Sequence, residues 1–188
     1  MQSKADDRTL LRAMGRGEAK ALEQLFTRHN VRVFRFLMRI VANQATAEEL
    51  TNEVFLAAWQ SAARYEGNSE PTTWLLAIAH NKAVSSLRKR REVTGIDEDA
   101  VGEIADDDDT PEVTTQKVDK ARAMREAIAD LSPDHREILD LVYYQERSVA
   151  DVAEILAIPE ATVKTRMFYA RKKLSERLAA RGIDRGWP

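Results

Sequence analysis

The feature that most constrains this chain is a pair of helix signals, separated by a tight turn, over residues 148–178. Ser148 followed by Asp151 forms a capping box, which predicts the start of a short helix. The run 157–159, which ends in proline, predicts a turn, and a longer basic helix is expected over 160–178. This order is typical of a helix-turn-helix, whose second helix enters the major groove of duplex DNA.

Apolar residues in this segment have the spacing for a small core between the two helices. They are Val149, Val152, Ala153, Leu156, Ile158 and Val163. On the second helix, lysine and arginine can reach guanine acceptors, and further basic residues suit phosphate contacts that position the protein. An amphipathic helical hairpin with a solvated basic face is the simpler alternative, and repressors, response regulators and sigma factors share this motif.

The rest of the chain also favours helices, because apolar residues recur at three- and four-residue spacing. Thr46-Ala47-Glu48-Glu49 has the form of a capping box, residues 67–71 predict a loop, and Ser132-Pro133 predicts a helix start. The expected helices cover 21–41, 46–62, 74–91, 121–131 and 133–144. The predicted fold class is therefore all-α.

Composition narrows the class of protein. The 188 residues are 44% hydrophobic and 32% charged, which is ordinary for a soluble protein of one or two small domains. There is no cysteine, no apolar run near 18 residues and no apolar segment behind Met1. We therefore expect a cytoplasmic protein with no disulfide, membrane insertion, secretory signal, metal or cofactor.

Charge divides the chain into three parts. Residues 1–95 carry a net charge of +5, residues 96–119 a net charge of −9 and residues 120–188 a net charge of +2. Self-repulsion and the scarcity of large apolar groups predict a flexible acidic linker over 96–119. A carboxylate metal site there is the weaker alternative, since consecutive aspartates on an extended chain diverge. The expected architecture is two small helical domains joined by this linker.

Two sets of motifs resemble bacterial sigma factors. Segments that resemble sigma region 4 are LSPDHREIL (131–139), SVADVAEIL (148–156), IPEATVKTR (158–166) and ARKKL (170–174). Segments that resemble sigma region 2 are EELTNEVFLAAW (48–59) and TWLLAIAHNKAV (73–84). Their order, with no third domain between them, resembles the extracytoplasmic-function (ECF) sigma factors.

The resemblance implies the partners and the residues that meet them. The N-terminal domain would bind the clamp of the largest subunit of core RNA polymerase, through Glu49, Asn52, Glu53 and Leu56. The C-terminal domain would meet the flap of the second subunit. Promoter DNA would be opened at the minus-10 element by Asn68, Ser69, Asn81, Lys82, Ser85 and Arg88. The minus-35 element would be read by Ser148, Glu160, Thr162, Lys164, Thr165, Arg166, Arg171 and Lys172.

Several positions depart from the family pattern. Pro71, Ser85 and Asn52 stand where Phe, Asp and Gln are frequent. Ala157 replaces the usual glycine of the turn, which is tolerable in a right-handed backbone conformation and costly in a left-handed one. Met167-Phe168-Tyr169 replaces a more basic stretch, and Phe168 would either pack on the domain or form part of a partner-binding surface.

Two other functional classes were weighed. An enzyme is not expected, because His29, His80 and His135 are scattered and the sequence lacks a phosphate-cradling glycine loop and a nucleophile elbow. A stand-alone helix-turn-helix regulator is the alternative function, and it would need no polymerase to find DNA. The resemblance also implies control by an anti-sigma factor that holds the two domains.

Overall fold

The computed structural model describes residues 6–94 and 115–183, and every regular element within those ranges is a helix. The all-α prediction is therefore confirmed. The first half of the chain forms α1 (Asp7–Gly15), α2 (Ala19–Val41), α3 (Gln44–Ser61), the short 3-10 helix η1 (Ala62–Arg64) and α4 (Pro71–Thr94). The second half forms α5 (Thr115–Ala129), α6 (Pro133–Leu139), the π-helical turn η2 (Asp140–Tyr144), α7 (Val149–Leu156) and α8 (Glu160–Ala180).

Each half of the chain has its own apolar core. In the N-terminal bundle α2, α3 and α4 pack on one another and α1 packs on α2 and η1. In the C-terminal bundle α8 packs on α5, α6 and α7. The largest fully buried side chains are Leu11, Leu25, Val33, Phe36, Leu37, Val54, Leu75, Leu76, Ile138, Leu141, Ile155 and Leu174. Full burial stabilises the fold by about 1.5–3 kcal/mol for each large apolar side chain.

Helix starts differ from the sequence predictions in two places. The proposed capping box at Thr46–Glu49 is wrong, because α3 begins earlier and its cap is Asn43, whose side chain accepts from the backbone N–H of Thr46 at 2.9 Å. Pro71, expected in the loop, is instead the first residue of α4. Proline suits that position because its missing N–H would have no partner inside the helix.

Other elements were not anticipated. The expected linker 96–119 lies outside the described residues except for its end, where α5 already begins at Thr115. The short helix α1 was not predicted. The helix that follows Ser132 does reach Tyr144, but its last part is the π-helical turn η2. Among the described helices, none is long and apolar enough to span a membrane.

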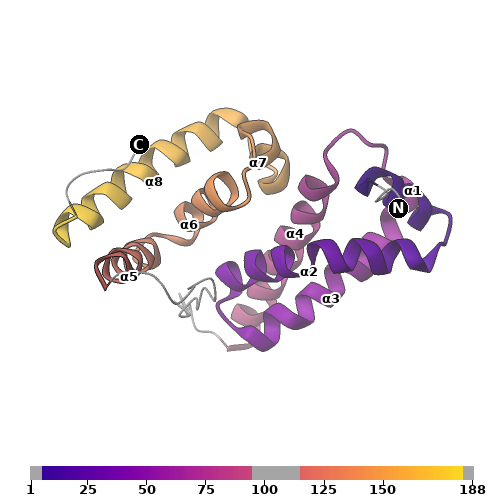
Figure 1. Cartoon of the computed structure of the whole chain (residues 1–188), viewed down its shortest axis with the longest axis horizontal. Coiled ribbons are helices and arrows are strands. Elements are labelled where there is room, and N and C mark those ends of the chain that lie inside the picture. Colours follow the sequence, from indigo (N-terminus) through magenta and orange to yellow (C-terminus); the bar gives the residue numbers. More distant parts are fainter. Residues whose placement is uncertain (1–5, 95–114, 184–188) are drawn as a thin grey trace.

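The two bundles lie against each other (Figure 1). α4 of the N-terminal bundle packs on α7, and α2 packs on α6. The sequence predicted the two bundles but not this contact between them. It places the promoter-melting helix of the resemblance beside the first helix of the helix-turn-helix.

Candidate nucleic-acid interface

The helix-turn-helix forms where the sequence predicts it. The Ser148 hydroxyl accepts from the backbone N–H of Asp151 at 3.2 Å, and the Asp151 carboxylate accepts from the backbone N–H of Ser148 at 3.1 Å. The predicted capping box of α7 is therefore confirmed. Burial raises the pKa of Asp151, but hydrogen bonds from Ser148 and Thr73 outweigh it and bring the pKa below its usual value. Asp151 thus stays ionised at neutral pH.

The turn adopts the costly form of the two that the sequence allowed. Ala157 has φ 52° and ψ 43°, which is left-handed, and its N–H donates to the carbonyl of Glu154. A Cβ atom in this conformation is unfavourable, which explains why glycine is usual there. The predicted small core does form: Val152, Leu156 and Val163 are buried, and Val149, Ala153 and Ile158 pack against them.

Helix α8 exposes most of the predicted DNA-contacting side chains. Its apolar stripe is buried and consists of Val163, Met167, Ala170, Leu174 and Leu178. Exposed on the outer surface are Glu160, Lys164, Thr165, Arg171 and Lys172. Lys164 lies 3.7 Å from Glu160, an exposed pair that is weak enough to break when a phosphate or base competes.

Two of the predicted residues are less available. Arg166 is partly buried and lies 3.3 Å from Asp134 of α6, so its guanidinium faces its own bundle. Thr162 is half-buried. Thr165 is exposed, but its hydroxyl donates to the carbonyl of Ala161 at 2.9 Å. Lys164 is therefore the most outward-facing cation in the first turns of α8.

Exposed aromatic rings complete this surface. Phe168 is 65% exposed and Tyr169 51% exposed, with their ring centroids 5.4 Å apart in a T-shaped pair. Phe168 does not pack into the core, so of the two roles that the sequence allowed it is left with the partner-binding surface. It follows Lys164 by four positions and precedes Lys172 by four, which puts the three side chains on one face. That spacing is the signal that could have placed Phe168 among the contact residues.

The predicted polymerase-binding residues share one face of α3. Glu49, Asn52 and Leu56 are exposed, at spacings of three and four residues, and Leu56 is 56% exposed. Glu53 lies beside them but is partly covered. The face therefore combines carboxylates, an amide and an apolar side chain, as the sequence predicted.

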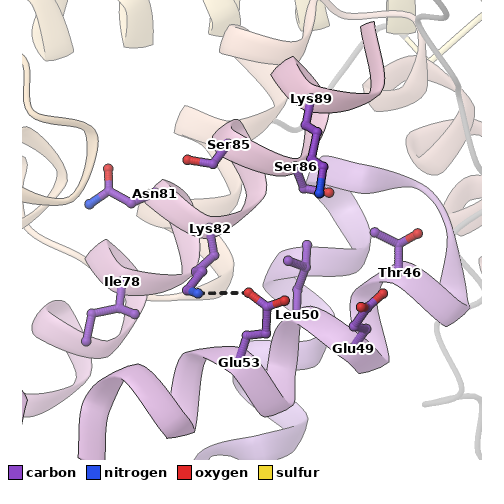
Figure 2. A pocket seen from close by; sticks show the side chains of 10 residues that line it. All are labelled: Thr46, Glu49, Leu50, Glu53, Ile78, Asn81, Lys82, Ser85, Ser86 and Lys89. Atoms are coloured by element: carbon purple, nitrogen blue, oxygen red, sulfur yellow. Dashed lines mark hydrogen bonds and ion pairs between the residues drawn. The ribbon is translucent and has the colours of Figure 1, made fainter. Parts of the chain in front are cut away.

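Glu53 connects this face to the candidate minus-10 surface (Figure 2). Its carboxylate lies 2.8 Å from the ammonium of Lys82 on α4. The pair spans a groove of about 620 Å³ between α3 and α4. The groove is lined by Thr46, Glu49, Leu50, Glu53, Ile78, Asn81, Lys82, Ser85, Ser86 and Lys89. Residues assigned to polymerase and residues assigned to DNA thus share one hollow, which the sequence did not predict.

The loop before α4 is held from both sides. Arg8 of α1 donates to the carbonyl of Gly67 at 3.2 Å and to Glu70 at 2.6 Å. The hydroxyl of Tyr65 donates to the carbonyl of Ser69 at 2.6 Å, and burial raises the pKa of Tyr65. Asn68 is exposed at the tip, where its amide donates to Glu66 at 3.0 Å. The loop therefore presents Asn68 from a fixed backbone.

Further candidate minus-10 residues lie along α4. Asn81, Ser85 and Arg88 are exposed, which leaves them accessible to a nucleic-acid strand. Trp74 is half-buried, packs on the core and lies against Tyr65 with ring centroids 5.3 Å apart. Its position suits support of the helix, the role that we expected for it.

Comparisons with known proteins agree with both halves. Residues 25–93 match the family model for Sigma-70 region 2, and residues 121–174 match the model for Sigma-70, region 4. The chain is 30% identical to the ECF RNA polymerase sigma factor SigL of Mycobacterium tuberculosis, over 89% of this chain and 94% of that protein. It is also 30% identical to SigK of Mycobacterium ulcerans, over 94% of this chain and 96% of that protein.

Solved structures share the fold. The sigma factor RpoE of Bartonella quintana, in complex with the anti-sigma factor NepR, matches with a TM-score of 0.70 and 26% identity, over 88% of this chain and 99% of that chain. CnrH, in complex with the cytosolic domain of CnrY, matches with a TM-score of 0.67 and 22% identity, over 93% and 97% of the two chains. With both sigma regions present in order and relatives that match along nearly its whole length, the chain belongs to the ECF subfamily of RNA polymerase sigma factors.

Proposed function

We propose that this chain is a transcription initiation factor that binds core RNA polymerase and directs it to promoters with specific minus-10 and minus-35 elements. The observation that carries the proposal is the presence, on one chain, of the α3 face beside a basic α4 and of a separate helix-turn-helix. A stand-alone regulator would need only the second feature. The catalytic chemistry would belong to the polymerase.

For polymerase, the proposed contact is the α3 face of Glu49, Asn52, Glu53 and Leu56. Its carboxylates suit a basic partner surface, and we assign the clamp of the largest polymerase subunit to it. Leu56 would bury its exposed side chain against the partner, since apolar anchors inside a polar rim carry much of the binding energy at interfaces. The flap of the second subunit is the proposed partner of the C-terminal bundle.

For the minus-10 element, the proposed contacts are Asn68 and Ser69 of the loop and Asn81, Lys82, Ser85 and Arg88 of α4. Unstacking a duplex costs a few kcal/mol per step, so a melting protein must bind the separated bases better than the paired ones. An exposed amide on a fixed loop, next to a basic helix, supports such a role, because basic grooves follow single strands. Ser69 contributes mainly its backbone here, since its carbonyl is already held by Tyr65.

For the minus-35 element, Lys164 is the leading candidate for a base contact, with Arg171 and Lys172 on phosphates. Ser148, Glu160, Thr162 and Thr165 would have supporting roles, and Arg166 would have to leave Asp134 to reach DNA. We also propose that an anti-sigma factor controls the chain. The RpoE structure, a fold match that contains such a factor, supports this.

Mixing the purified chain with core polymerase tests the proposal. We expect a stable holoenzyme and run-off transcripts that start at defined promoters. Lys164→Ala should reduce transcription from those promoters, whereas Lys20→Ala removes an exposed lysine from the start of α2 and should leave it unchanged. If the chain neither joins core polymerase nor yields promoter-specific transcripts, and instead binds a palindromic site alone, the stand-alone regulator becomes the better assignment.

A further inference from the structure

The contact between the two bundles is made by polar groups that pair across it. His80 of α4 lies 2.7 Å from Glu137 of α6, and each side chain is only 15% exposed. The hydroxyl of Thr73, at the start of α4, donates to Asp151 of α7 at 2.9 Å. Arg147, just before α7, donates to the hydroxyl of Thr72 at 2.8 Å. These partners lie on facing helices, so the contact has a defined register.

The most deeply buried of these groups is Asp140. It is 4% exposed and pairs with Arg39 near the end of α2. The guanidinium of Arg39 also lies 4.4 Å from the ring centroid of Tyr144. Within the described residues, the side-chain donors to Asp140 are Arg39 and Gln145, and only Gln145 belongs to the same bundle. A buried carboxylate is unfavourable without a partner, so the C-terminal bundle is completed by a cation from the N-terminal one.

This packing is incompatible with simultaneous binding to both promoter elements. By their names, the minus-10 and minus-35 elements lie about 25 base pairs apart, which is about 85 Å of DNA at about 3.4 Å per base pair. α4 and α8 both pack on α7 in this structure. α8 has 21 residues and is about 32 Å long, so helices joined in this way cannot reach both elements.

We infer that the interface of α2 and α4 with α6, η2 and α7 is an autoinhibitory contact by which this chain closes on itself without any other protein. The closed chain is unable to bind both promoter elements, and core polymerase binds the open form. Its inhibitory role rests on the proposed function. The inference differs from control by an anti-sigma factor, because the occupant of the inhibiting surface is the chain's own C-terminal bundle.

A distance measurement on the free chain tests the closed state. The sequence has no cysteine, so Gln24→Cys on α2 and Ser175→Cys on α8 introduce two exposed sites for spin labels. Pulsed electron paramagnetic resonance should give one narrow, short distance distribution that lengthens when core polymerase is added. His80→Glu, which opposes two carboxylates at Glu137, should lengthen and broaden it.

Rescue and control variants make the test specific. Adding Glu137→Lys to His80→Glu restores opposite charges and should restore the short distance. Arg39→Glu should open the chain as His80→Glu does. Arg64→Glu makes the same charge change on η1, which packs on α1 and α3, and should leave the distance short. Circular dichroism checks that each variant keeps its helices, and the His80→Glu pair alone is sufficient if Arg39→Glu unfolds.

The outcomes separate the two proposals. If nine-tenths or more of the free chain is closed, open variants should bind core polymerase at least about tenfold more tightly, because apparent affinity scales with the fraction of the competent form. A wild-type chain that transcribes but shows a long, broad distance distribution, or variants that stay short, overturn the autoinhibitory contact alone. A chain that fails in run-off transcription overturns the proposed function and, with it, the inhibitory role.

Discussion

Replacing Ala157 with glycine tests whether the turn of the helix-turn-helix is strained. Ala157 has φ 52° and ψ 43°, a left-handed conformation that costs an L-residue with a Cβ atom about 1–2 kcal/mol. Glycine removes this cost, but its greater freedom in the unfolded chain offsets about 0.5–1 kcal/mol of the gain. The net increase in the free energy of unfolding should be about 0.5–1 kcal/mol. For a bundle of this size that melts as a unit, Tm should rise by about 2–8 °C.

Thermal unfolding followed by far-UV circular dichroism measures this change. Ala42→Gly, at a second left-handed position with φ 50°, should raise Tm in the same direction. The control is Ala57→Gly in the interior of α3, where the backbone is right-handed and glycine should lower stability by about 1 kcal/mol. An unchanged or lower Tm for Ala157→Gly would refute the strain argument, especially if Ala57→Gly behaves as expected.

Three further predictions concern binding and pH. Lys172→Ala should weaken DNA binding about equally on all sequences and make the slope of log K against log salt shallower by about 1, measured by fluorescence anisotropy; a loss confined to one promoter sequence would contradict the phosphate role. Leu56→Ala should weaken binding to core polymerase by about 1–3 kcal/mol in a titration and leave Tm unchanged, because the side chain is 56% exposed; unchanged affinity would remove Leu56 from the contact. Burial, despite Arg39, raises the pKa of Asp140 from 3.8 to about 6, so the folded chain holds this proton more tightly than the unfolded chain. This contribution is present below pH 4 and is lost as pH rises through 6, so the free energy of unfolding of the wild type minus that of Asp140→Asn should fall over that range by at most about 3 kcal/mol; a difference that is independent of pH in chemical denaturation would contradict the shift.

Local rules predicted the elements whose signals lie within a few residues. The cap of α7 depends on Ser148 and Asp151, three positions apart, and it formed as predicted. At α3 two local signals competed, Asn43 and the run 46–49. The outcome depended on α2, which ends at Val41 with a left-handed Ala42, so the chain turns at once and Asn43 becomes the cap. Such a choice cannot be made from the α3 sequence alone.

The candidate site was predictable where it lies on one helix face. The α3 face follows from spacing, and so does the exposure of Lys164 on α8. Contacts between elements did not follow from spacing, because they depend on how the helices pack. The pairing of Arg166 with Asp134 requires the position of α6, and that of Lys82 with Glu53 requires the α3–α4 packing.

The contact between the bundles is the extreme case. Arg39 and Asp140 are separated by 101 positions in the sequence, and no periodic pattern relates them. Each also has an ordinary local reading, as a helix-surface arginine and as the middle of a helix. Only the packed structure shows that burial of one depends on the charge of the other.

The π-helical turn η2 has a consequence for chain length. A π turn accommodates about one residue more than an α-helical turn, and Asp140 and Tyr144, at its two ends, both contact Arg39. Deleting one residue here would let the helix continue as an α-helix and rotate everything after it by about 100°, so Arg147 would no longer point to Thr72. Relatives that are one residue shorter between α6 and α7 should therefore lack this contact between bundles, even where the paired residue types are the same. Within the family, the length of this segment would then distinguish chains that close on themselves from chains that do not.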